Sequence, residues 1–159
     1  MAGNRDLASL MSNLNKLIFD LSPSNRYATF FYGEYNPSTK ELNFVNGGHN
    51  PPMILRGEEW IHLEAGGPAV GLFGPAHYEQ SQITLAVGDL LIGFTDGISE
   101  AMNSMDEEWG EEELAKWVMD RRQTGVVELI PAIMEGADAF AAGAPQHDDM
   151  TLVVARVTG

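Results

Sequence analysis

The chain has 159 residues, 44% hydrophobic and 20% charged, which predicts one globular domain over residues 1–159. Its 23 acidic and 9 basic residues give a formal net charge of -14, which argues against nucleic acid or an anionic membrane as a partner and indicates a solvated acidic surface. No cysteine is present, so disulfides and thiolate metal sites are excluded, and without a recognisable membrane span or signal peptide we expect a cytoplasmic location.

The first predicted element is a helix over residues 5–20, because its apolar residues recur at spacings of three and four. They are Leu7, Leu10, Met11, Leu14, Leu17 and Ile18. Residues 26–35, RYATFFYGEY, are apolar on both alternating faces, which predicts a strand buried between layers. The turn sequence YNPSTK then leads into residues 41–46, so the two runs predict a β-hairpin.

The middle of the chain predicts short strands separated by turns, with a glycine-rich loop over residues 64–77. These strands cover residues 53–56, 60–63, 78–87 and 90–94. Two helices follow, over residues 111–122 and 126–142, and Pro131 is expected to kink or restart the second. A last strand covers residues 150–157. Because hairpins join most strands, we predict an α+β fold with two mainly antiparallel sheets, in which the last two helices cover one outer face.

Two acids stand at the ends of apolar runs, where strands usually avoid charge. Asp96 follows the run LLIGF, and Asp148 precedes the final strand. If the two strands are neighbours, both carboxylates point into one cleft, and we expect a separation of about 4–7 Å, short enough to share a hydrated Mg²⁺ or Mn²⁺. On spacing alone an Asp-Gly after a strand is more often a simple turn.

Three motifs occur in a fixed order: GGHNPP, FTDGISEA and QHDDMTLVV. Together with YATFFYGEYNPSTKELNFVN and GPAVGLF, they resemble the SpoIIE/RsbU-like branch of the metal-dependent (type 2C, PPM) serine/threonine protein phosphatases, over residues 5 to 157. The resemblance implies an α-β-β-α sandwich. It also implies hydrolysis of phosphoserine or phosphothreonine with Mn²⁺ or Mg²⁺ at a two-metal site, on small anti-sigma-factor antagonists in bacterial partner-switching pathways.

The resemblance assigns roles residue by residue. Asp96 and Asp148 match metal-binding, catalytic positions of the family, and Gly97 belongs to the same Asp-Gly motif. Asp149 replaces an asparagine of many relatives and is treated as supporting, because adjacent residues of a strand point to opposite faces. Glu100 reaches a metal-bound water if a helical turn begins at the glycine, and otherwise is an exposed turn acid.

His49 and Asn50 precede two prolines, which favours an extended backbone. They either position phosphate beside the cleft or form a hydrogen-bonded corner between two strands, and the corner is the favoured interpretation. His147 is read as a surface residue beside the acids.

The chain departs from the family at its start, since nothing matches the Gly-Asp strand and the glycine-rich histidine motif that precede the first helix. The sequence therefore resembles a partial catalytic domain that lacks a bridging aspartate, and we expect weak or no activity from this chain alone. A missing strand also leaves a sheet edge on which a homodimer can form. Two alternatives stay open: a non-catalytic regulatory or interaction module, and a structural Ca²⁺ site without turnover.

Overall fold

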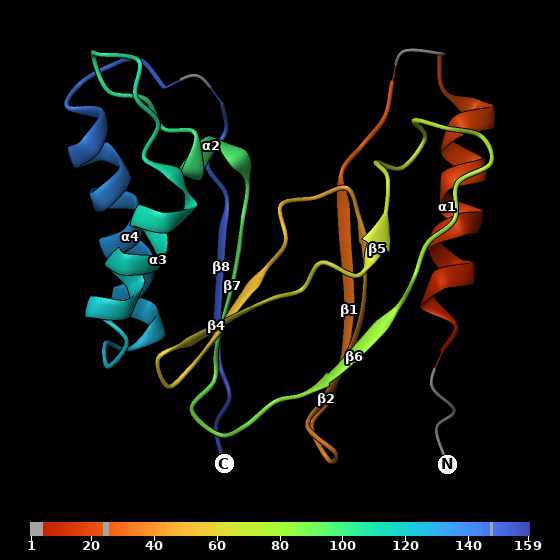
Figure 1. The fold of residues 1–159 in the computed structure, drawn as a ribbon, viewed down its shortest axis with the longest axis horizontal. Helices are drawn as coiled ribbons and strands as arrows, with labels where there is room; N and C mark the ends of the chain where they lie inside the picture. The colour runs from red at the N-terminus through yellow and green to blue at the C-terminus, as the bar shows by residue number, and fades with distance from the viewer. Residues whose placement is uncertain (1–4, 24–25, 147) are drawn as a thin grey trace. The chain divides into compact units, whose positions relative to one another are not determined.

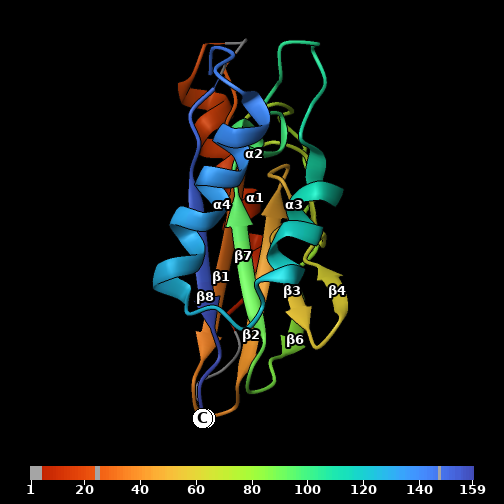
Figure 2. The ribbon, with the colours of Figure 1, turned by 90° about the vertical axis from the view of Figure 1, so that its left-hand side faces the viewer.

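The computed structural model describes residues 5–23, 26–146 and 148–159. It divides the chain into two compact units, each assembled from two stretches of sequence. Unit 1 comprises residues 1–51 and 62–86, and unit 2 comprises residues 52–61 and 87–159. Each unit contains one sheet and at least one helix, drawn in Figures 1 and 2.

Unit 1 contains a sheet in the order β1-β2-β5, with β6 also paired to β2. Its strands are β1 (Phe30–Asn36), β2 (Glu41–Gly47), β5 (Gly66–Gly67) and β6 (Ser81–Thr84). The predicted hairpin is confirmed: β1 and β2 pair antiparallel from Phe30 opposite Gly47 to Asn36 opposite Glu41. The short β5, within the segment predicted as a loop, pairs parallel with β2, and the other pairings of this sheet are antiparallel.

Helix α1 (Leu7–Leu21) lies beside this sheet (Figure 1). It packs there through one narrow stripe of side chains. Leu7 and Met11 are buried against Val45 and Val70. The predicted apolar face is wider than the stripe that is buried, because Leu10 and Leu17 are 48% and 56% exposed. The position one turn beyond Met11 on the buried stripe is polar, and the sequence pattern did not predict its burial.

That polar residue is Asn15, which is 1% exposed. Its Nδ2 donates to the carbonyl oxygens of Phe73 and Gly74, while its Oδ1 accepts from the Gly71 amide and the Tyr78 hydroxyl. All its polar atoms are therefore satisfied, which removes most of the cost of burying an amide. Burial also raises the pKa of Tyr78. Asn15 thus ties the glycine-rich segment to α1.

The expectation that residues 26–35 form a strand buried between layers is wrong. Strand β1 stands at the end of the strand order, and Phe30 and Tyr35 are 41% and 44% exposed. Its neighbour β2 is buried almost throughout. The composition of β1 resembles that of a central strand, but its place at the edge leaves one side of it uncovered.

Unit 2 contains an antiparallel sheet in the order β4-β3-β7-β8. Its strands are β3 (Met53–Arg56), β4 (Glu59–His62), β7 (Leu90–Phe94) and β8 (Leu152–Arg156). Strand β7 pairs with β3 on one side and with β8 on the other, where Leu90 lies opposite Arg156 and Phe94 opposite Leu152. The central position of β7 explains why its residues alternate between buried and half-buried.

Helices α3 (Gly110–Asp120) and α4 (Val126–Ala141) cover one face of this sheet, as Figure 2 shows. Leu114 and Val118 of α3 and Leu129 and Ile133 of α4 are fully buried in a core shared with the strands. Of the two outcomes expected at Pro131, the restart does not occur, since α4 continues through it, and the kink stays a prediction. Proline has no amide hydrogen to donate, so the helix lacks one hydrogen bond on a side where Val127 is 76% exposed to water.

A buried ion pair lies at one end of the unit 2 sheet. Asp89, just before β7, is 3% exposed. Its carboxylate accepts from Arg56 at the end of β3, with 3.1 Å from Nε to Oδ1 and 2.6 Å from Nη2 to Oδ2. The two-point contact raises the pKa of Arg56 and balances the buried negative charge.

The predicted fold class is confirmed: the chain is α+β, with two mainly antiparallel sheets that each carry a helical layer. In the part of the chain that the structure describes, none of the helices has the length and apolar character needed to span a bilayer.

Candidate functional site

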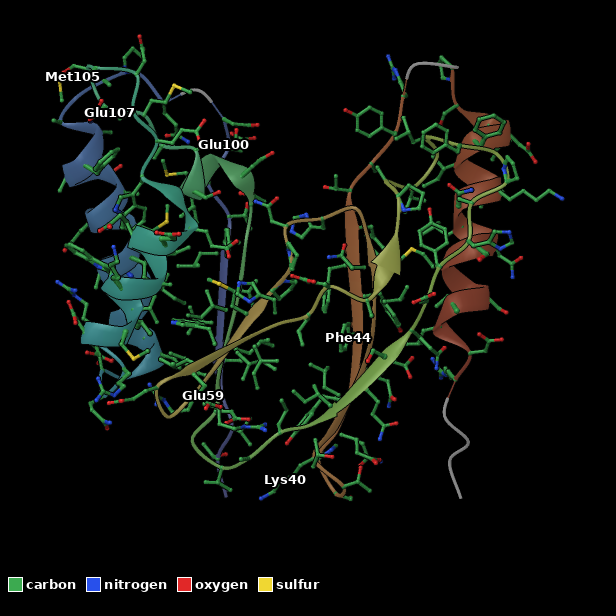
Figure 3. The ribbon with its side chains drawn as sticks, in the orientation of Figure 1. Lys40, Phe44, Glu59, Glu100, Met105 and Glu107 are labelled. Carbon is green, nitrogen blue, oxygen red and sulfur yellow. The ribbon has the colours of Figure 1, made fainter. Side chains whose placement is uncertain are left out.

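The candidate site forms where β7 ends and the chain turns into α2 (Asp96–Ser99), a single helical turn. Thr95 is extended and Asp96 opens the turn, so the Asp96 side chain stands at the end of the strand, exposed to solvent. Asp96 Oδ1 accepts from the Gly97 amide at 2.9 Å, and its carbonyl oxygen accepts from the Glu100 amide at 2.7 Å. The helical turn suggested for Glu100 is present, and Glu100, labelled in Figure 3, follows its last residue.

Thr95 connects this turn to the segment that carries the second acid. Its amide donates to the Thr151 carbonyl oxygen at 3.1 Å. Its hydroxyl donates to the Asp149 carbonyl oxygen and accepts from the Thr151 amide, both at 2.9 Å. The three bonds continue the β7–β8 pairing past the strands and hold residues 149–151 beside residue 95. Sequence reasoning missed Thr95, whose only sequence signal is its place before the Asp-Gly pair.

The surroundings of Gly97 leave no room for a side chain after Asp96. A Cβ at this position would lie 2.5 Å from the Asp149 carbonyl oxygen and 3.1 Å from that of Asp148. The first distance is shorter than a real Cβ contact, and the second is tighter than most. Any side chain at residue 97 would therefore push α2 and the Asp148–Asp149 segment apart. The buried glycine thus lets the backbone of the two acids approach α2.

Asp148 and Asp149 lie four and three residues, respectively, before β8, which begins at Leu152. The strand was predicted to begin at residue 150, so both acids stand further before it than expected, and the alternation of strand side chains does not apply to this pair. Both acids are exposed, and Asp148 Oδ1 accepts from the Asp149 amide at 2.7 Å. The direction of the two side chains is therefore determined by the loop before β8 and not by the alternation of side chains along a strand.

A surface recess opens beside these segments, entirely within unit 2. Glu100 and Asp148 line it, together with Asp138 from α4 and Gln146. Gln146 Nε2 donates to the Asp148 carbonyl oxygen at 2.7 Å. Sequence reasoning missed Asp138, which lies in the last turn of α4 with no motif around it. The predicted carboxylate separation for Asp96 and Asp148 of about 4–7 Å stays a prediction, and His147 lies outside the described residues.

His49 and Asn50 belong to unit 1, just after β2. The Asn46 side chain bonds both backbone groups of His49: Oδ1 accepts from its amide, and Nδ2 donates to its carbonyl oxygen, each at 2.8 Å. The His49 ring nitrogen Nδ1 lies 3.2 Å from the Thr29 hydroxyl. These bonds describe the hydrogen-bonded corner. A chemical role for His49 or Asn50 stays a prediction.

The donors present at the acidic end of β7 suit a hydrated hard cation only in part. Exposed carboxylates on adjoining turns match the oxygen ligands that Mg²⁺ and Mn²⁺ prefer. Within residues 5–23, 26–146 and 148–159, however, no three acidic or histidine side chains cluster closely enough to enclose an ion. This donor set fits a loosely held ion that keeps most of its waters.

A search against protein families matched residues 1–158 to the family of Stage II sporulation protein E (SpoIIE). The chain belongs to the SpoIIE family. The resemblance read from the motifs is thereby confirmed.

Named relatives fit this assignment. The phosphoserine phosphatase RsbU of Bacillus subtilis is 25% identical over 153 residues, which is 94% of this chain and 44% of RsbU. Protein IcfG of Synechocystis is 30% identical over 128 residues, 80% of this chain and 20% of IcfG. The SpoIIE-family chain thus spans less than half the length of either relative.

Solved structures share the fold. The SiaA-PP2C domain of Pseudomonas aeruginosa superposes with a TM-score of 0.80 at 20% identity, covering 98% of this chain and 62% of that domain. The catalytic domain of the phosphatase PstP, solved in complex with two manganese ions, gives a TM-score of 0.70 at 16% identity, covering 96% of this chain and 70% of that one.

Proposed function

We propose that this chain takes part in hydrolysing phosphoserine or phosphothreonine on a regulatory protein, of the anti-sigma-factor antagonist type, in a bacterial partner-switching pathway. The observation that carries the proposal is the contact of Gly97 and Thr95 with the Asp148–Thr151 segment, because it brings two acid-bearing turns to one end of a sheet. The name of the relative RsbU, a phosphoserine phosphatase, supports the substrate class. A cytoplasmic location remains part of the proposal.

The proposed roles follow from position. Asp96 and Asp148 supply carboxylate oxygens to Mn²⁺ or Mg²⁺, and the manganese complex of PstP supports this choice of metal. Gly97 permits the approach of the two turns, while Glu100 and Asp149 would accept hydrogen bonds from water held beside the metal. His49 and Asn50 orient the phosphoryl group. When bound, the metal supplies Lewis acidity toward the phosphoryl oxygens and the attacking water.

The chain by itself is proposed to be a poor catalyst. A two-metal clamp needs a carboxylate that bridges ions held about 4 Å apart, and the described residues offer no cluster of three metal-binding side chains. A third carboxylate on a Gly-Asp strand, as the resemblance implies, would complete the set. Two acids alone hold one hydrated ion weakly.

The test is phosphate release from a phosphoserine peptide with Mn²⁺. We expect little turnover by the 159 residues and metal-dependent turnover by the same chain extended upstream as its gene reads. In the extended chain, Asp96→Asn and Asp148→Asn should each abolish turnover. Asp120→Asn, at the exposed end of α3, is the matched control and should leave it unchanged. Robust turnover by the 159 residues would mean that a ligand among Asp149, Glu100 and Asp138 completes the site.

The second candidate is a non-catalytic regulatory or interaction module. The absence of a three-residue metal cluster among the described side chains favours it. An extended chain that folds, binds the phosphoprotein and releases no phosphate would establish this function and refute the first.

A homodimer through the outer edge of β1 is proposed as well. Among the described strands β1 pairs with β2 alone, and its exposed Phe30 and Tyr35 would be covered by a second copy. Sedimentation equilibrium tests this. We expect Tyr35→Pro, which removes an edge amide, to shift the mass toward the monomer, while a wild-type monomer at high concentration would refute the dimer.

A further inference from the structure

A second recess lies at the opposite end of the unit 2 sheet from Asp96. It is lined by Arg122, Gln123 and Arg156 and by the turn glycines Gly57 and Gly88, with leucines of β3 and β7 behind them. We call it the arginine recess. Two arginines and no acidic residue line it, in a chain where acidic residues outnumber basic ones by 23 to 9. Its local charge is therefore opposite to that of the whole molecule.

Arg156 is held in place by neutral groups. Its Nη2 donates to the carbonyl oxygens of Arg122 and Thr124, at 2.8 and 3.0 Å. Arg156 is half-buried as a residue, and no carboxylate of the described residues forms an ion pair with it. The two carbonyl oxygens orient the charge without neutralising it, so an anion placed beside Arg156 would gain favourable electrostatic energy.

Arg122 is only weakly compensated. Its Nη1 donates to the Met119 carbonyl oxygen, and its Nη2 lies 3.5 Å from a carboxylate oxygen of Glu58. Glu58 is 81% exposed, and a long ion pair at the surface contributes little. A guanidinium carries five N–H donors, so both arginines keep donors beyond those bonds.

The acid beside this recess is already occupied. Asp89 stands between the lining residues Gly88 and Leu90, but its carboxylate is bound by Arg56 at two points. Its negative charge is therefore already balanced within the fold by Arg56.

We propose that the arginine recess binds a phosphate group. Two guanidinium groups that flank an open pocket can each donate to a tetrahedral oxyanion, the geometry for which arginine is suited. No aromatic side chain lines the recess, so it offers no stacking surface for a nucleobase. The group comes either as free inorganic phosphate or as the monoester of phosphoserine. The proposal does not depend on the function proposed for the Asp96 end.

The experiment is a titration of the ¹⁵N-labelled 159-residue chain, with EDTA present so that no metal occupies the acidic turns. Inorganic phosphate and phosphoserine are added separately at constant ionic strength, with chloride as the reference anion. We expect saturable shifts of the Arg122 and Arg156 Nε–H signals and of the Gly57 and Gly88 amides. Saturation at lower concentration by phosphoserine than by phosphate identifies a monoester site, and the reverse order identifies a free-phosphate site.

Arg122→Gln is the decisive variant, because it removes only a local bond to Met119 and the long contact with Glu58. Arg156→Gln would instead break the two bonds that join β8 to residues 122–124. Loss of one charge-assisted contact should weaken binding about tenfold. Arg121→Gln is the matched control: Arg121 lies 3.7 Å over the Trp117 ring and does not line the recess. Shifts that do not saturate, that chloride reproduces, or that Arg121→Gln weakens as much as Arg122→Gln would overturn the proposal.

Discussion

The two ends of the β7–β8 pair place acids in opposite circumstances. At the end near α2, Asp96 and Asp148 are exposed, and backbone contacts at Gly97 bring their segments together. At the other end, Asp89 is 3% exposed and is neutralised by Arg56 within the fold. The acids at the two ends are of the same residue type, so the difference lies in their exposure and in whether the fold supplies a basic partner. An exposed aspartate without such a partner is available to a cation, whereas a buried, paired aspartate stabilises the fold.

The largest expected effect comes from breaking the buried pair. Arg56→Met leaves the Asp89 carboxylate buried without its guanidinium, and we expect a loss of about 3 kcal/mol in the free energy of unfolding. The estimate is at the low end for a buried pair because the Arg56 side chain is 37% exposed. Urea unfolding followed by circular dichroism measures the loss.

Two further variants sharpen this result. Replacing both partners, Arg56→Met with Asp89→Leu, should recover most of the lost stability, because no buried charge is left without a partner. Lys116→Met removes the exposed pair with Glu113 and should cost about 0.5 kcal/mol or less. If Arg56→Met were as mild as Lys116→Met, the contrast between the two ends would not hold.

Gly97→Ala tests the steric contact at the acidic end. The added methyl group would meet the Asp149 carbonyl oxygen at 2.5 Å, so we expect about 1–3 kcal/mol of destabilisation as the segments separate. Gly93→Ala is the matched control in β7, where the nearest atom to an added Cβ is 4.0 Å away. Thermal unfolding of the two variants compares them, and equal melting temperatures would contradict the role given to Gly97.

Thr95→Val tests the hydroxyl that links the two turns. The substitution keeps the side-chain shape but removes the hydroxyl that donates to the Asp149 carbonyl oxygen and accepts from the Thr151 amide. We therefore expect the free energy of unfolding to fall by about 1 kcal/mol. Amide hydrogen exchange at Thr151 should accelerate, since its partner is gone. Ser99→Ala, which removes a longer 3.3 Å bond, should leave that exchange rate unchanged. Unchanged exchange in Thr95→Val would refute the link.

Local patterns predicted most of the fold. The run LLIGF followed by Asp-Gly gave both the strand and the turn that carries Asp96, because a buried strand and a glycine turn are local signals. The strand MTLVVARV was predicted for the same reason. The exposure of β1 was not predictable, since an edge strand and a central strand differ in their neighbours and not in their own residues.

The candidate site was only partly predictable from the sequence. Motifs identified Asp96, Gly97 and Asp148, but the Thr95 hydroxyl finds its partners 54 and 56 residues along the chain. Asp138 lies on a helix whose packing brings it to the recess, and nothing in the residues around it signals this. The burial of Asn15 could not be predicted either, because it depends on the hydrogen bonds that its side chain makes to a loop distant in the sequence.

The division of each unit into two stretches of sequence bears on the order of events during synthesis. The last residue of unit 1 to be synthesised is residue 86. The β3–β4 hairpin, residues 53–62, is made before that point. That hairpin carries Met53, Ile54 and Leu55, all of which are buried in the finished protein. Their partner β7 is synthesised only later, so the nascent chain holds an apolar hairpin without its pairing strand when residue 86 of unit 1 has been added.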